Sequence, residues 1–210
     1  MPTQLQHALD YMRLGGWVMI PIGVCSVAMW MFIAERLRVF RSLGSGDVSI
    51  AEAIAVVSDG ADLRPVDGLR ARLVRGYLDG RCGHPEIDCQ IMRHSAMKLH
   101  GMLRARLAAI AVLAAVAPLL GLLGTVLGMI ETFDVIAFFG TSNAKAMAGG
   151  ISVALITTQG GLVVAIPGLY ISGNLSRKSR HLETMLDEIT TVLVRHIRSH
   201  GTPVREGDTP

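Results

Sequence analysis

The sequence predicts an all-α integral membrane protein with three transmembrane helices and long helices that extend into the cytoplasm, assembling as a ring. Half of the 210 residues are apolar and the mean hydropathy is +0.44. Only 18% are charged, against about 25% in a typical soluble domain. The charges are absent from three long apolar stretches and gather, largely as arginine, beside them. This pattern is typical of a polytopic membrane protein.

The three predicted spans are residues 15–34, 107–130 and 148–171. A helix of about 20 residues rises about 30 Å, which is the thickness of the hydrocarbon core. A cleaved signal peptide fits the first stretch poorly, because a charged cluster and no small-residue cleavage site follows it. That cluster consists of Glu35, Arg36, Arg38 and Arg41.

The positions of the basic residues predict the orientation of the spans. Arginine and lysine clusters follow the first span, precede the second and follow the third, whereas the connection between the second and third holds one base, Lys145. Basic loops stay in the cytoplasm. We therefore assign residues 1–14 to the periplasm, 35–106 to a cytoplasmic helical region, 131–147 to a periplasmic loop, 172–200 to a cytoplasmic C-terminal helix and 201–210 to a disordered tail.

The cytoplasmic regions read as helices. Ser49 and Glu52 have the spacing of a capping box, and the short helix that they begin ends at Asp59-Gly60. A second short helix is predicted over 65–78. From Pro85 an apolar stripe continues toward the second span, so we expect one helix of ~45 residues and ~68 Å.

Two apolar stripes in these regions indicate self-association. They are formed by Met92, Ala96, Leu99 and Leu103, and by Leu182, Met185, Ile189, Leu193 and Ile197. A single subunit would expose both stripes to water. A closed ring of identical subunits would cover them.

The second span carries small residues at helical spacing. Gly121, Thr125 and Gly128 fall on one face with Ala117, and Gly124 adds a Gly-x-x-x-Gly motif with Gly128. Such faces allow helices to approach closely in lipid, and we assign the same packing role to Gly161 of the third span. Thr125 is the polar group on this face. It either satisfies its own helix carbonyl or also faces water or a partner.

The third span holds a polar belt of Thr157, Thr158 and Gln159. Three adjacent positions spread over ~200° of a helix, so one neighbour cannot bury all of them. Interhelical packing and a polar pathway both explain the belt. Glu131 and Asp134 lie at the outer mouth, where they either concentrate protons or cap and solvate the helix end.

No Asp, Glu, Lys, Arg or His lies in the middle of any predicted span. A proton relay in a membrane normally needs an ionisable group. If the chain lines a proton channel, the titrating group must therefore belong to another chain.

Other function classes find no support in the sequence. Cys82, His84 and Cys89 do not have a zinc-site spacing and lack a fourth ligand, so no metal or cofactor is expected. The basic residues follow membrane topology rather than a nucleic-acid-binding motif. No motif of a membrane or soluble hydrolase is present, so we do not expect an enzyme.

The segments 117–130, 150–158 and 161–168 resemble the paired-span signature of the MotA/TolQ/ExbB proton-channel family, and the chain length resembles the ExbB/TolQ-like branch. The resemblance implies a homopentameric ring around a single-span ExbD/TolR-like partner. In that family the partner's membrane Asp carries the proton, so we expect it to face Thr125 and Thr158. The resemblance also implies a location in the bacterial inner membrane. Force would pass to a TonB- or TolA-like protein, as in TonB-dependent transport.

Val153 departs from the family pattern, in which a Glu is frequent at this position. The ring then has no carboxylate of its own, and Gln159 can only form hydrogen bonds. A passive inner-membrane scaffold is the alternative function. It would need the small-residue faces but not the polar belt, so Thr158→Val separates the two.

Overall fold

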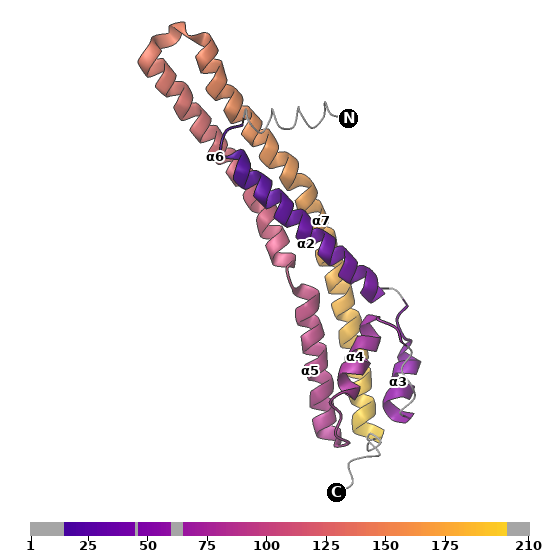
Figure 1. Cartoon of the computed structure of the whole chain (residues 1–210). Helices are drawn as coiled ribbons and strands as arrows, with labels where there is room; N and C mark the ends of the chain where they lie inside the picture. The colour runs from indigo at the N-terminus through magenta and orange to yellow at the C-terminus, as the bar shows by residue number, and fades with distance from the viewer. Residues whose placement is uncertain (1–14, 45, 60–64, 201–210) are drawn as a thin grey trace. The chain divides into compact units, whose positions relative to one another are not determined.

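The computed structural model describes residues 15–44, 46–59 and 65–200, and it contains helices and no strand within these ranges (Figure 1). The elements are α2 (Met19–Gly44), α3 (Ile50–Asp59), α4 (Leu69–Leu78), α5 (Pro85–Arg104), α6 (Leu107–Phe139), the 3-10 helix η1 (Gly140–Ser142) and α7 (Ala144–His200). Among the residues that the structure describes, three helical segments are long and apolar enough to cross a membrane. The predicted all-α class with three spans is confirmed. The predicted N-terminal segment and C-terminal tail lie outside the described residues.

The chain folds into two compact units. The first contains residues 1–34 and 106–174, and the second contains residues 35–105 and 175–210. Helices α2 and α7 each contribute residues to both units, because α2 continues past residue 34 and α7 continues past residue 174.

In the first unit, α6 and the first part of α7 form a hairpin closed by η1 (Figure 1). Gly140 has a φ of 68°, which ends α6 in a conformation that glycine adopts without strain. Because α6 continues to Phe139 and α7 begins at Ala144, most of the segment 131–147 that was predicted as a loop is helical. Glu131 and Asp134 are compatible with a helix, and only the cluster Gly140–Asn143 breaks it.

The expectation of one helix from Pro85 through the second span is wrong. Helix α5 ends at Arg104 and α6 begins at Leu107, with Arg106 in the left-handed conformation at a φ of 61°. In the second unit, Arg36 is 4% exposed and donates to the carbonyl oxygen of Met102 at 2.9 and 3.0 Å, and also to that of Ala105. These hydrogen bonds satisfy carbonyls that the end of α5 leaves open.

The second unit buries both predicted cytoplasmic stripes within one chain. The α5 stripe is buried throughout, and in the α7 stripe only Met185 is partly exposed. Contacts such as Cys89 Sγ to the carbonyl oxygen of Val194, at 3.7 Å, join the two helices. The stripes are confirmed, but they do not by themselves require a second subunit.

Two carboxylates cap the starts of α3 and α4 in this unit. Glu52 accepts from the backbone of Ser49 at 2.9 Å and the Ser49 hydroxyl accepts from the backbone of Glu52 at 3.2 Å, which confirms the capping box. Asp47 accepts from the backbone N–H groups of Arg70 and Ala71 at 3.0 and 3.3 Å. This distant cap explains why α4 begins at Leu69 rather than at the predicted Pro65.

An ion pair between α5 and α7 makes the stability of this unit depend on pH. Arg104 donates two hydrogen bonds to Glu183, at 3.1 and 2.8 Å, and these hold the pKa of Glu183 below its usual value of 4.5. A carboxylate whose pKa is lower in the folded than in the unfolded protein stabilises the fold at pH values above its unfolded-state pKa. This stabilisation is lost as the pH falls through its folded-state pKa.

We therefore expect the thermal stability of the purified protein to fall as pH drops below about 4.5. Glu183→Gln should lower the melting temperature at pH 7 and flatten its decline in acid. Exposed Glu188, on the same helix, provides the control substitution Glu188→Gln, which should leave the profile unchanged. An unaltered acid decline in Glu183→Gln would contradict the assignment.

Candidate functional site

The contact between α6 and α7 is built from glycine backbones. Gly121 lies against Thr157, Thr158 and Gly161, and a Cβ on Gly121 would be 3.0 Å from the carbonyl oxygen of Thr157. A Cβ on Gly128 would be 2.6 Å from the carbonyl oxygen of Gly150. The distance at Gly128 is too short for any Cβ, and the distance at Gly121 is tighter than most real Cβ contacts, so a side chain there would push the backbones apart. Only glycine permits this approach, which is how helices associate closely in lipid.

Thr157 lies inside this contact. Its side chain is 0% exposed, and its hydroxyl oxygen lies directly against Gly124. The hydroxyl is within 2.9 Å and 3.0 Å of the carbonyl oxygens of Val153 and Ala154 on its own helix. The structure therefore separates Thr157 from the other predicted pathway residues, because no exposed surface of this residue remains.

Thr158 lies on the opposite side of α7 from α2. Val153, Ile156 and Gly160 contact α2 or the turn that precedes it, and each of them is followed directly by a residue that contacts α6. Thr158 follows the α6-facing Thr157. Each residue turns the helix by about 100°. Ile156 therefore points about 100° to one side of the α6-facing Thr157, and Thr158 points about 100° to the other side.

Thr125 lies on the corresponding side of α6. Leu127 and Glu131 line a hollow beside the start of α2, whereas Thr125 follows the α7-facing Gly124 by one position. At about 100° per residue, Leu127 and Thr125 lie on opposite sides of Gly124. Thr125 and Thr158, both partly exposed, therefore share the face of the α6–α7 pair that α2 leaves open.

The hydroxyl groups on this open face point their protons into their own helices. Thr125 donates to the carbonyl oxygen of Leu122 at 2.6 Å, and Thr158 donates to that of Ala154 at 3.0 Å. The remaining lone pairs of each oxygen can accept a hydrogen bond. The open face therefore offers acceptors at two positions and suits a protonated acid or a water molecule.

The remaining predicted site residues lie elsewhere. Gln159 is exposed, two positions beyond Thr157, and so faces away from the α6 contact. Glu131 and Asp134 are exposed and line a hollow of about 450 Å³ with Trp17 and Val153. The structure thus groups the two acids with the start of α2 and not with the two threonines.

Cys82 and Cys89 do not form a ligand set with each other. Cys82 is exposed, with its Sγ 3.4 Å from the carbonyl oxygen of Gly80, whereas Cys89 is buried against α7. In the ranges that the structure covers, no three His, Cys, Asp or Glu side chains are grouped as metal ligands would be.

Sequence reasoning missed Arg36 as a buried residue. The sequence places Arg36 in one charged cluster with Arg38 and Arg41 after the first span, but of these three arginines only Arg36 is buried. The pKa of Arg36 is lowered by burial. No local pattern distinguishes it from its neighbours, because its partners lie in α5, far along the chain.

Comparison with known proteins finds relatives of the chain in one family of membrane proteins. The profile of the MotA/TolQ/ExbB proton channel family matches residues 67–188. Biopolymer transport protein exbB1 of Vibrio cholerae is 32% identical over 183 residues, covering 79% of this chain and 76% of that protein. Biopolymer transport protein ExbB of Aquifex aeolicus is 44% identical over 93 residues, covering 44% of this chain and 62% of that protein. The Tol-Pal system protein TolQ of Haemophilus influenzae is 36% identical over 90 residues, covering 41% of this chain and 40% of that protein.

Proposed function

Because the chain belongs to the MotA/TolQ/ExbB proton channel family, in its ExbB/TolQ-like branch, we propose that it is the ring subunit of a motor driven by the proton-motive force. The family is one of membrane channels and transport proteins rather than of enzymes. In this proposal the subunit conducts protons together with a single-span ExbD/TolR-like partner. The motor transmits force to the periplasm or outer membrane through a TonB- or TolA-like protein.

The open face of the α6–α7 pair carries the proposal. Thr125 and Thr158 offer hydrogen-bond acceptors in an otherwise apolar surface, and the spans contain no carboxylate. Acceptors without a titrating group suit a pathway whose proton carrier belongs to another chain. A protonated Asp in the partner's span could donate to either threonine as it passes.

Exposed apolar side chains support the homo-oligomeric ring, which we propose to be a pentamer. On α6 and α7 they include Leu119, Leu122, Val126, Leu155, Val163 and Ile166. Contact with lipid accounts for part of this surface. A ring would place the threonine face toward its axis and the flanking apolar surfaces against neighbouring subunits.

The bacterial relatives and the three apolar helices indicate an inner-membrane protein. The basic clusters around the spans support a periplasmic N-terminus and a cytoplasmic C-terminus. With Val153 in place of a carboxylate, we propose that proton transfer depends on the partner's Asp. Glu131 and Asp134 would attract protons at the periplasmic side.

Adjacent threonines provide the test of this function. We expect Thr158→Val to lower proton flux through the assembled complex in proteoliposomes by about tenfold, the effect of one lost hydrogen bond in a transition state. Thr157→Val removes an identical hydroxyl one residue away, inside the helix contact. It should leave the flux within about twofold of the unmodified complex, since Thr157 has no exposed surface from which it could contact a passing proton carrier.

Native mass spectrometry should show that both variants assemble like the unmodified chain. Equal flux in Thr158→Val and the unmodified complex would favour the passive scaffold, which needs the glycine contact alone. A monomer or dimer without a small single-span companion would contradict the ring.

A further inference from the structure

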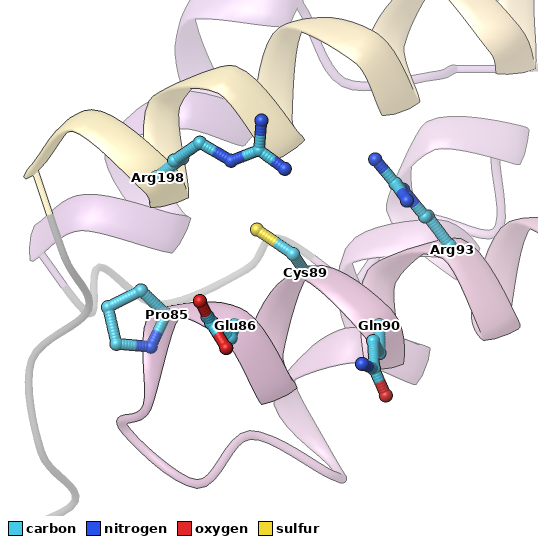
Figure 2. A pocket seen from close by; sticks show the side chains of 6 residues that line it. All are labelled: Pro85, Glu86, Cys89, Gln90, Arg93 and Arg198. Atoms are coloured by element: carbon cyan, nitrogen blue, oxygen red, sulfur yellow. The ribbon is translucent and has the colours of Figure 1, made fainter.

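Three arginines surround two adjoining cavities between α5 and α7 in the second unit. The cavities measure about 350 and 300 Å³, and Arg93 and Arg198 line both of them. Arg195 lines the second cavity. Figure 2 shows the guanidinium groups of Arg93 and Arg198 on either side of Cys89, extending from the two helices toward the same space.

The floor between these arginines is apolar. Cys89 and Val194 are 6% and 8% exposed, and the thiol is directed at the Val194 carbonyl oxygen. Nearby Thr190 and Thr191 donate their hydroxyl protons to carbonyl oxygens of α7 at 2.6 and 2.8 Å. Recognition of a ligand in these cavities would therefore fall to the guanidinium groups.

Among the described residues, the three arginines are not held in ion pairs, and Glu86 is the one carboxylate that lines the cavities with them. Within the part of the chain that the structure describes, no carboxylate forms an ion pair with Arg93, Arg195 or Arg198. Arg198 lies in the last turn of α7, where a cation suits the helix dipole. Arg93 lies within α5, away from both helix ends, so an interaction with the helix dipole does not account for its positive charge.

We propose that these cavities bind a phosphate-bearing anion. Guanidinium groups match phosphate oxygens with paired hydrogen bonds, and a phosphate presents acceptors in several directions at once. One phosphate group would lie between Arg93 and Arg198 over Cys89. A second would reach Arg195 in the adjoining cavity. The two volumes lie at the lower end of the range of small-ligand pockets, which suits a diphosphate.

Glu86 provides a second test of anion binding, with an effect opposite to that of the arginines. Its carboxylate lines the first cavity beside the arginines and would repel a bound anion. Neutralising it should therefore tighten binding, whereas neutralising either shared arginine should weaken it. Surface charge alone would shift anion binding in the same two directions, so these effects must be larger than the effect of neutralising an arginine outside the cavities.

Isothermal titration of the purified, detergent-solubilised complex with sodium pyrophosphate tests the site. We expect saturable binding that weakens about tenfold in Arg93→Gln or Arg198→Gln and strengthens in Glu86→Gln. Arg180→Gln is the matched control, because Arg180 is exposed on α7 but lines neither cavity. It should bind pyrophosphate like the unmodified complex. If a Gln variant does not fold, Arg93→Lys keeps the charge and loses the paired geometry, and should give a smaller loss.

A second arm distinguishes a free phosphate from a lipid headgroup. It measures by native mass spectrometry how much phosphatidylglycerol remains bound after extraction from vesicles of phosphatidylglycerol and phosphatidylcholine. Loss of retention in Arg93→Gln but not in Arg180→Gln, without pyrophosphate binding, would assign the same phosphate chemistry to a lipid. Absence of both forms of binding, or an equal loss in Arg180→Gln, would overturn the proposal. Neither arm depends on proton conduction.

Discussion

Gly161→Ala is expected to destabilise the first unit severely and to reduce the amount of folded protein in the membrane. A Cβ at this position would lie 2.7 Å from the carbonyl oxygen of Ala117 and 3.1 Å from the Cα of Gly121. Both neighbours are backbone atoms, so α6 and α7 would have to move apart. Overpacking of this kind costs about 1–3 kcal/mol and sometimes more. Thermal unfolding followed by fluorescence-detected size exclusion measures the loss.

The matched control is Gly149→Ala, near the start of the same helix. No atom lies within 4 Å of a Cβ at Gly149, so the added methyl group has open space. Alanine also favours a helix over glycine, so stability should be unchanged or slightly higher. Equal destabilisation by the two substitutions would show that the close contact at Gly161 is not what holds α6 against α7.

Arg36→Met should destabilise the second unit by about 2–4 kcal/mol, although it replaces a charge by an apolar side chain of similar length. The substitution leaves the carbonyl oxygens of Met102 and Ala105 without their buried donor. Two unsatisfied carbonyls account for this cost. Chemical denaturation of the solubilised protein measures the change. Hydrogen exchange of the Ala105 amide, which donates to Gly101, should become faster as the end of α5 loosens.

Arg38→Met is the control for this prediction. Arg38 is exposed on the same helix, and its loss should change stability by less than about 0.5 kcal/mol. Arg36→Lys should fall between the two, since an ammonium group retains donors but not the fork that spans two carbonyls. If Arg36→Met is as stable as Arg38→Met, the carbonyl contacts contribute little.

The spans were predictable because lipid imposes a simple rule. A helix that crosses the membrane needs about 20 apolar residues, and the three stretches stand out by composition alone. The capping box at Ser49 was also readable, because both of its partners lie within four residues. Features of this kind depend on local sequence and can be predicted without knowledge of the fold.

The break between α5 and α6 was not predictable in this way. Arg104, Ala105 and Arg106 are all good helix formers, and neither Gly nor Pro marks the site. The hydrogen bonds from Arg36, more than sixty residues earlier, support the ended helix. A tertiary contact therefore overrides local propensity at this point.

The polar belt shows a similar limit. Periodicity established that Thr157, Thr158 and Gln159 face three directions, but it did not say which residue faces the neighbouring helix. The position of Gly124 decides this, because it admits Thr157 and leaves Thr158 partly exposed. The same register moves Thr125 off the most buried stripe of α6, which runs through Gly121, Gly124 and Gly128.

The order of the segments in the two units has a consequence for biosynthesis. The second unit takes its first part from residues 35–105 and its last from residues 175–210, so the ribosome completes the whole third apolar stretch in between. Until then Glu183 and Val194, the partners of Arg104 and Cys89, do not exist in the nascent chain. While the last two spans are synthesised, helix α5 therefore lacks its α7 partner and can pack only against earlier elements such as α4. A ribosome stalled just before residue 175 would have made every segment of the first unit but only the first part of the second.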